Sequence, residues 1–282
     1  MSGLAPGLYL VATPIGAARD ITLRALDILR DADILAAEDT RVLRKLLEIH
    51  GIALRGRTIL PYHDHNGAAM RPRIEAAVAE GRSVAFASDA GTPLVADPGY
   101  ALARGVRAAG GLVTTAPGPS APLAALSLSG LPSDRFLFAG FLPAADGDRR
   151  RMLRDLAQVP ATLIFFETAR RCAESLAAML DELGNREAAI CRELTKKFEE
   201  VRQGRLDVLT EGVREVAPKG EIVIVVDRPR GGPDSGDVDT ALRTAMRDMS
   251  VKDAARFVAE ALGVPRRDVY QRALELGKET GE

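Results

Sequence analysis

The sequence predicts an α/β protein of two domains followed by a small helical unit. Short apolar runs alternate with amphipathic segments over residues 1–227, which is typical of a mostly parallel sheet covered by helices. A stretch rich in Gly and Pro at 228–237 then separates these residues from a C-terminal segment that has helical patterns only. The length of 282 residues also exceeds that of one typical domain.

The first domain is expected over residues 1–118. Its strands are the apolar runs at 8–13, 32–38, 58–63, 83–88 and 111–117. Between the first two runs, Asp20 is a candidate N-cap for a crossover helix. Apolar residues recur there at helical spacing, at Ile21, Ala25, Ile28 and Leu29. We therefore expect parallel strands joined by helices.

The second domain is expected over residues 119–230, with a mixed sheet. Its strands are predicted at 135–143, 161–167, 187–194 and 221–227. Helices are expected to begin at about Arg149 and about Arg170, between the first three of these strands.

The third unit, 231–282, comprises the linker's end and a helical appendage. "SVKD" (250–253) resembles a capping box. One stripe of apolar residues follows at Ala254, Phe257, Val258, Ala261 and Leu262. "GVPRRD" (263–268) then turns the chain into a helix carrying Tyr270 and Leu274. A helix-turn-helix that binds nucleic acid is one interpretation, but packing or dimerisation is the commoner use of such hairpins, so we favour it.

Composition narrows the class of protein. Lys and Arg number 38 against 39 Asp and Glu, and this net charge of −1 excludes an overall basic nucleic-acid binder while allowing local basic patches. Cys172 and Cys191 belong to no CxxC motif, so no disulfide framework is predicted. No signal peptide or membrane-length apolar run is found. We expect a cytoplasmic protein with no membrane partner.

Three loops rich in Gly and Pro follow predicted strands, at "TPIG" (13–16), "SDAGTP" (88–93) and "PGPSA" (117–121). In an open α/β sheet this is the edge where ligands bind. Gly91 and Gly118 would let the backbone approach a ligand, and Ser120 is placed to cap a helix whose N-terminus favours anions. Neither GxGxxG nor a P-loop occurs, so a cofactor of another kind is expected.

"YHDHN" (62–66) contains two of the three histidines, His63 and His65. Alternation along a strand would put both rings on one face, where they could bind a metal or transfer a proton. No third ligand is evident. We therefore favour hydrogen-bonded histidines at a strand end, with substrate positioning left open, and predict no metal.

A set of motifs resembles one family in order along the chain. The segments are "LYLVATPIG…DITLRAL", "AAEDTR" (36–41), "SDAGTPLVADPGY" (88–100), "PGPSA", "SGLPSDRFLFAGFLP" (129–143), "RELTKKFEE" (192–200) and "KGEIVIVV" (219–226). Together they resemble the tetrapyrrole-methylase superfamily, and within it the branch that methylates small-subunit ribosomal RNA. The resemblance covers most of residues 4–227, and the helical appendage is also similar to that branch.

The resemblance implies a two-domain tetrapyrrole-methylase-like fold with the methyl donor S-adenosylmethionine in the cleft between the domains. It also implies 2′-O-methylation of a cytidine in the decoding region of 16S rRNA, within naked rRNA or the small ribosomal subunit, by a homodimer. The donor site carried over on matching motifs comprises Pro14, Asp89, Ala90, Gly91, Thr92, Ser120, Ala121, Phe166 and Gly220. Two departures are Ala17, where the family usually has Asn, and the lack of a Lys between "GFLP" and Arg149.

Methyl transfer to a hydroxyl needs collinear reacting atoms and a group that takes up the proton. The candidate bases are carboxylates at predicted strand ends, namely Glu38, Asp39, Asp89 and Glu167. Arg41 is placed to pair with a carboxylate or a phosphate. For "EDTR" (38–41), acids in the first turn of a helix are an equally weighted interpretation. The choice of base stays open on the sequence.

The RNA would be held by local basic clusters, at 148–154, 169–171 and 195–197 with Arg202 and Arg205, and stacked on Phe198 or Tyr62. Each cluster is more often a solvated helix face. Competing functions are a tetrapyrrole (precorrin-type) carbon methyltransferase with the same donor loops, and a non-enzymatic RNA-binding protein with no affinity for the donor. A metal-dependent hydrolase built on "HDH" comes last.

Overall fold

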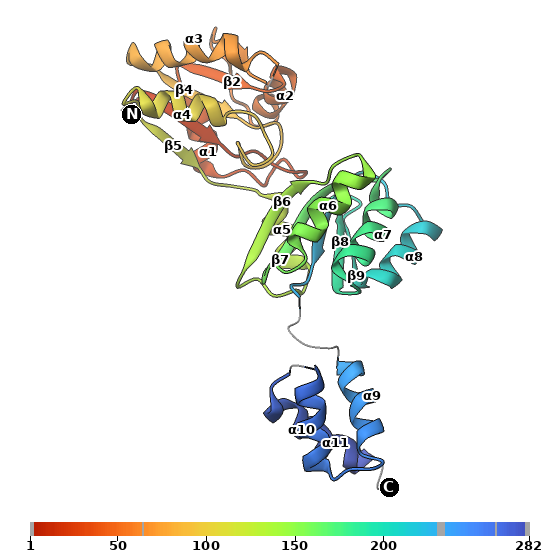
Figure 1. Cartoon of the computed structure of the whole chain (residues 1–282). Coiled ribbons are helices and arrows are strands. Elements are labelled where there is room, and N and C mark those ends of the chain that lie inside the picture. The colour runs from red at the N-terminus through yellow and green to blue at the C-terminus, as the bar shows by residue number, and fades with distance from the viewer. Residues whose placement is uncertain (1–2, 64, 230–234, 263, 280–282) are drawn as a thin grey trace. The chain divides into compact units, whose positions relative to one another are not determined.

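The computed structural model describes residues 3–63, 65–229, 235–262 and 264–279. The chain forms two compact units, Met1–Asp227 and Arg228–Glu282 (Figure 1). The larger unit contains two separate five-stranded sheets, one in each half. The predicted α/β class is therefore confirmed.

The first sheet is wholly parallel, in the order β3-β2-β4-β1-β5. Its strands are β1 (Gly7–Val11), β2 (Ile34–Ala37), β3 (Ile59–Pro61), β4 (Ser83–Ala87) and β5 (Val113–Ala116). The helices are α1 (Leu23–Asp31), α2 (Thr40–Ile49), α3 (Gly67–Ala79) and α4 (Tyr100–Ala108). Because the strands are parallel, the loops that follow them all leave from the same edge.

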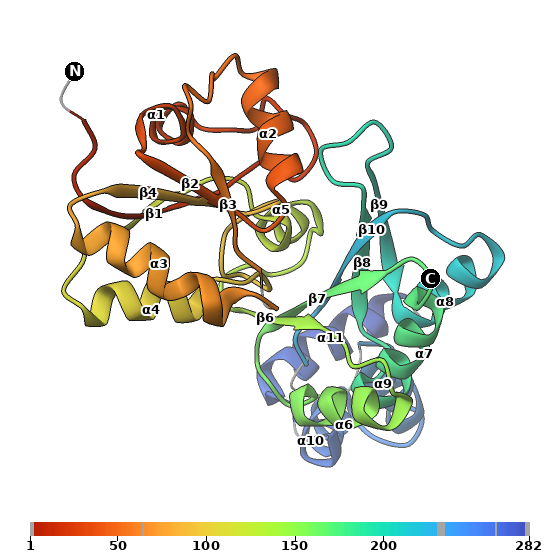
Figure 2. The same cartoon turned by 90° about the horizontal axis from the view of Figure 1, so that it is seen from above.

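Side-chain alternation along the strands builds a core on each face of this sheet. Val11 and Leu35 face α1 and α2, whereas Leu8, Val84 and Phe86 face α3 and α4. Figure 2 shows these helix pairs on opposite sides of the sheet. This is why the strands have continuous apolar runs rather than a polar alternation.

Helix α1 corrects one prediction about its start. Its N-cap is Thr22 and not Asp20, because the Thr22 side chain accepts a hydrogen bond from the Ala25 amide at 3.1 Å. The predicted apolar face is otherwise confirmed, since Ala25, Ile28 and Leu29 are buried.

The second sheet is mixed, as predicted, with the order β6-β7-β10-β8-β9. β6 and β7 are parallel, and the other neighbours are antiparallel. Its strands are β6 (Phe136–Phe141), β7 (Thr162–Thr168), β8 (Glu187–Arg192), β9 (Glu200–Arg205) and β10 (Glu221–Val226). Helix α5 (Ala121–Leu128) packs on one face. The other face is covered by α6 (Asp146–Leu156), α7 (Cys172–Leu183) and α8 (Leu206–Glu215).

Two elements of this half are absent from the sequence prediction, β9 and α8. Because α5 contacts β7 and β10, we propose that the first domain ends near Gly118.

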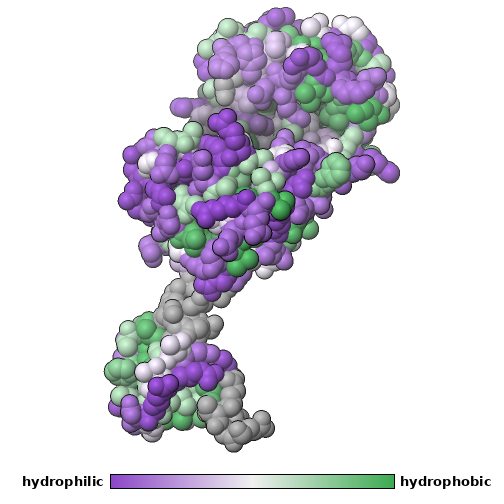
Figure 3. Space-filling view, turned by 90° about the vertical axis from the view of Figure 1, so that its right-hand side faces the viewer, coloured by the Kyte–Doolittle hydropathy of each residue, from purple (hydrophilic) through white to green (hydrophobic). Residues whose placement is uncertain are grey.

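Both cysteines are buried free thiols. Among the described residues, no helix is long and apolar enough to cross a membrane. Hydrophilic residues predominate on the face shown in Figure 3.

The smaller unit contains three helices in its described part, α9 (Ser235–Ala245), α10 (Val251–Leu262) and α11 (Arg266–Glu279). Of the predicted linker, 230–234 lie outside the described residues, and 235–237 already belong to α9. Ser250 caps α10 as predicted, since its Oγ accepts the Asp253 amide, but the Asp253 carboxylate accepts from the Ser250 hydroxyl rather than from its amide and so departs from a capping box. Phe257 is 54% exposed, contrary to its place in the predicted stripe.

Candidate functional site

Hydrogen bonds tie the strand-end loops of the first sheet to one another. Thr13 and Gly91 exchange two backbone hydrogen bonds of 2.9 and 3.0 Å. The Thr92 hydroxyl donates to the Pro119 carbonyl at 2.9 Å. The Asp39 amide donates to Asp89 Oδ1 at 2.9 Å. The loops after β1, β2, β4 and β5 are thus held as one edge.

The segment 88–99 has an unusual backbone. Its φ angle is positive at Gly91 (86°), Leu94 (70°), Ala96 (59°) and Gly99 (120°). Such conformations at non-glycine residues cost about 1–3 kcal/mol each and cluster at functional sites. Gly118 is different, because a Cβ there would lie 3.1 Å from Ala12 Cβ. Gly118 therefore permits close packing on the β1 end, and its approach to a ligand stays a prediction.

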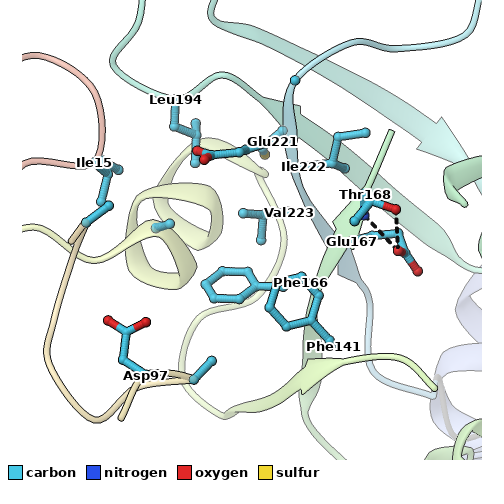
Figure 4. Close-up of a pocket in the computed structure, with 15 residues that line it drawn as sticks. Ile15, Asp97, Phe141, Phe166, Glu167, Thr168, Leu194, Glu221, Ile222 and Val223 are labelled. Carbon is cyan, nitrogen blue, oxygen red and sulfur yellow. Dashed lines mark hydrogen bonds between the residues drawn. The ribbon is translucent and has the colours of Figure 1, made fainter. Parts of the chain in front are cut away.

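A cavity of about 310 Å³ lies at this edge, and we name it the central cavity. Both halves of the larger unit supply its walls. Its lining residues are Ile15, Ala90, Ala96, Asp97, Ala121, Phe141, Phe166, Glu167, Thr168, Cys191, Leu194, Gly220, Glu221, Ile222 and Val223. The volume falls in the range of small-molecule sites. Figure 4 shows Phe141, Phe166 and Val223 grouped in the close-up of this cavity.

The walls of the central cavity suit a ligand that has both a flat ring and a positive charge. Phe166 packs against Phe138 and Phe141, with ring centroids 4.9 and 5.3 Å away. Aromatic faces attract cations as well as apolar groups. Asp97 and Glu221 add carboxylates to the lining, and the Asp97 carboxylate accepts a hydrogen bond from Ser88 Oγ.

A second cavity, of about 520 Å³, adjoins the same loops, and we name it the α2 cavity. It is lined by Thr13, Pro14, Gly16, Ala18, Asp39, Arg41, Val42, Lys45, Leu46, Ile49 and Asp89. The chain neighbours Asp89 and Ala90 line different cavities, as do Pro14 and Ile15. The two cavities therefore share their walls at these two loops.

The pKa values of the two carboxyl groups in the α2 cavity are shifted in opposite directions. Asp39 caps α2, and hydrogen bonds from Arg41 lower the pKa of its carboxyl to about 2. The Arg41 guanidinium contacts it through two nitrogens, Nε at 3.0 Å and Nη2 at 2.6 Å. Burial raises the pKa of Asp89; the hydrogen bond from the Asp39 amide opposes this rise, and the negative charge of Asp39 adds to it. Asp89 is therefore the better proton acceptor of the pair.

The predicted donor residues divide into three groups. Ala90, Ala121, Phe166 and Gly220 line the central cavity, whereas Pro14 and Asp89 line the α2 cavity. Gly91, Thr92 and Ser120 lie in the loops that carry the walls and are not among the lining residues of either cavity. Ser120 occupies the N-cap of α5, but its side chain makes no capping hydrogen bond.

The predicted catalytic residues also separate. Asp39 and Arg41 line the α2 cavity, and Glu38 lines neither cavity. Glu167 lines the central cavity, yet its carboxylate is fully buried and points away from Phe166 in Figure 4. It accepts hydrogen bonds from the Thr168 amide at 2.7 Å, Arg171 Nε at 2.9 Å and Ser175 Oγ at 2.5 Å. This network favours a structural role for Glu167.

Several lining residues were not predicted, among them Asp97, Leu194 and Glu221. Asp97 lies inside "SDAGTPLVADPG", so the motif itself was a signal for it. Leu194 belongs to the β8–β9 loop, which packs directly on the loop after β1. A Cβ at Gly16 would lie 2.6 Å from both Thr195 Oγ1 and Lys196 Cγ. Thr195 Oγ1 also accepts the Ala17 amide at 3.0 Å.

The other candidate features resolve as follows. In the described part of the chain, no group of His, Cys, Asp and Glu could hold a metal ion. His63 and His65 are in edge contact, with 6.0 Å between their ring centroids.

Every arginine of the 149–151 cluster is ion-paired, Arg149 and Arg150 with Asp146 and Arg151 with Asp148. That cluster therefore has the charge pattern of an ion-paired helix face.

Comparison with known proteins identifies both parts of the chain. The model of the family Tetrapyrrole (Corrin/Porphyrin) Methylases matches residues 7–210, and that of the RsmI C-terminal HTH domain matches 232–277. The second description agrees with the helix-turn-helix interpretation, whereas packing or dimerisation was the interpretation favoured from the sequence. Solved structures of similar fold include the methyltransferase CobJ, with a TM-score of 0.60 and 21% identity over 83% of this chain and 97% of that one. Diphthine synthase has a TM-score of 0.61 and 17% identity, over 78% of this chain and 89% of that one.

Relatives of similar sequence span nearly the whole chain. Ribosomal RNA small subunit methyltransferase I of Mesorhizobium japonicum is 52% identical, over 99% of this chain and 95% of the relative. The protein of the same name from Escherichia coli O157:H7 is 42% identical, over 95% of this chain and 94% of the relative. The chain thus belongs to the tetrapyrrole methylases and, within them, to the ribosomal RNA small subunit methyltransferase I family.

Proposed function

We propose that this protein transfers a methyl group from S-adenosylmethionine to the ribose 2′-hydroxyl of a cytidine in the decoding region of 16S rRNA. The observation that carries the proposal is the central cavity. Segments from "SDAGTP", "PGPSA", "FFE" and "KGE", far apart in sequence, meet around it. The ribosomal substrate is supported by the names of the relatives, and the cytidine and its 2′-hydroxyl by the motif resemblance.

The residues of the central cavity fit the donor. S-adenosylmethionine supplies a methyl group on a positively charged sulfur when it is bound. Phe166 and Phe141 offer apolar and cation-attracting surface, and Asp97 offers negative charge. The small side chains of Ala90 and Ala121 leave room for main-chain contacts.

The hydroxyl acceptor is assigned to the end of the α2 cavity that adjoins the central cavity at Asp89 and Ala90, because the 2′-oxygen must reach the methyl carbon directly. Asp89 is the proposed proton acceptor, because it lines this cavity and burial raises its pKa. Asp39 donates its amide to Asp89 and so positions that carboxylate. Arg41 keeps Asp39 ionised.

The test is methyl transfer to small ribosomal subunits, and to naked 16S rRNA, from cells that lack this modification. We expect incorporation of labelled methyl from S-adenosylmethionine, mapped to a cytidine 2′-oxygen by nuclease digestion and mass spectrometry. Methylation of a base carbon or nitrogen would contradict the proposal. Failure to bind S-adenosylhomocysteine in a calorimetric titration would favour the non-enzymatic alternative.

We further infer that the protein acts as a homodimer in the cytoplasm. The resemblance supports the dimer, and the site of ribosome assembly and the free buried cysteines support the compartment. Light scattering on the purified protein tests the dimer, which a monomeric mass at micromolar concentration would contradict.

A further inference from the structure

The mouth of the α2 cavity carries cations on one exposed helix face. Arg41 and Lys45 of α2 line the cavity with 89% and 66% of their side chains exposed. Val42 and Ile49, on the same helix, also line it and are 42% and 54% exposed. Arg41 is paired with Asp39 and Lys45 with Glu48 at 3.0 Å, so a phosphate must compete for these two cations, which lie beside apolar surface.

The β8–β9 loop brings a second group to this mouth. Thr195 and Lys196 pack on Gly16, which itself lines the α2 cavity. The next two residues, Lys197 and Phe198, follow within about 8 Å along the chain. Figure 2 shows this loop extending from the second half toward the first.

The two lysines of the loop have different roles. Lys196 Nζ is paired with Glu193 at 3.0 Å and Glu221 at 2.9 Å, so its charge holds the loop in place. Lys197 makes no ion pair with the described residues, and its Nζ lies 5.5 Å from the centroid of the Phe198 ring. Phe198 is 63% exposed.

We propose that Arg41, Lys45, Lys197 and Phe198 form a rim that grips single-stranded ribosomal RNA on both sides of the target nucleotide. Lys197 contacts a phosphate and Phe198 stacks on a flanking base. Exposed cations next to an aromatic ring are the means by which proteins hold single strands. The carboxylates lie inside the cavity and would repel phosphates, which leaves the ribose as the group that enters. This inference rests on the proposed function.

The test compares the double variant Lys197→Ala, Phe198→Ala with the wild-type protein and with Arg151→Ala. Arg151 is a matched control, because it is also an exposed cation of the second half but is paired with Asp148. Three kinds of experiment are done on the full chain: S-adenosylhomocysteine affinity by calorimetry, affinity for unmethylated small subunits at several salt concentrations, and methyl-transfer kinetics that give KM and kcat.

We expect the double variant to bind S-adenosylhomocysteine within twofold of wild type, because neither residue lines the central cavity. Affinity for the subunit should fall roughly tenfold or more, with KM rising to match and kcat within about threefold. The slope of log affinity against log salt should decrease by about 0.7, the value for one phosphate contact to a single strand. Arg151→Ala should match wild type in all three experiments.

Phe198→Tyr should retain most of the subunit affinity that Phe198→Leu loses, because only an aromatic ring stacks. Unchanged subunit affinity in the double variant would overturn the rim while leaving the proposed function intact. Loss of S-adenosylhomocysteine affinity alongside it would also overturn the rim, because the loop would then serve the donor. If the wild-type protein methylates no RNA, the proposed function itself fails.

Discussion

Replacing Glu167 by Gln separates a structural from a catalytic role for this carboxylate. The side chain is fully buried, and its charge pairs with Arg171, whose side chain is 19% exposed, at 2.7 Å. Removing one partner of a buried ion pair costs about 3–5 kcal/mol. The partial exposure of Arg171 and the retained amide oxygen reduce this to about 3 kcal/mol. A change of that size lowers the midpoint of thermal unfolding by roughly 6–12 °C.

The assay pairs thermal unfolding with methyl transfer at 20 °C, where the variant is still folded. We expect a clear loss of stability and a kcat within about threefold of wild type, because the carboxylate faces Ser175 and Arg171 rather than the α2 cavity. A variant with wild-type stability but a hundredfold lower kcat would refute this reasoning and return Glu167 to the candidate bases.

Three further predictions concern single side chains. Asp89→Asn should lower kcat by about 10²–10⁴, the usual effect of a general base. Because the pKa of Asp89 is raised in the folded state, ionisation of this carboxyl destabilises the wild-type protein as pH rises. The Asn variant should therefore be as stable as the wild type, or more stable, when unfolded at pH 7. For the same reason, the wild-type pH–rate profile should lose activity on acidification at a pH above the ordinary Asp value. Gly91→Ala should cost about 1–2 kcal/mol, because φ is +86°, and weaken S-adenosylhomocysteine binding measured by calorimetry. Ser250→Ala should destabilise the smaller unit by about 1 kcal/mol in differential scanning calorimetry and leave donor affinity unchanged.

The sequence predicts the first half well because its strands are buried on both faces. β1 and β4 are continuous apolar runs that no amphipathic helix resembles. β9 escaped prediction because "EVRQGR" is an edge strand whose residues are partly exposed. Phe257 was placed in the core stripe, but α10 turns the small residues Ala255 and Ala259 inward instead.

From residue patterns alone the site was predictable on one side only, because Phe166 and Gly220 of the opposite wall were chosen from the family resemblance. Gly, Pro and Asp at strand ends mark the loops of the first sheet, so Ala90, Ala121 and Asp39 could be chosen from the motifs. The opposite wall is made of apolar residues such as Leu194, Ile222 and Val223. An apolar side chain on a strand has the same pattern whether it meets a helix or a cavity. Only the packing of the second half against the first distinguishes the two.

In the proposed mechanism, Arg41 contributes to both RNA binding and proton transfer. Its guanidinium holds Asp39 ionised, and the negative charge of Asp39 helps to raise the pKa of Asp89. Its side chain is also 89% exposed at the mouth of the α2 cavity, where a phosphate would compete for it. A phosphate bound there would weaken the hold on Asp39 and so change the field at the proposed base. RNA binding and proton transfer are therefore expected to be coupled through this residue, whereas Lys197 and Phe198 lie outside that pair of carboxylates.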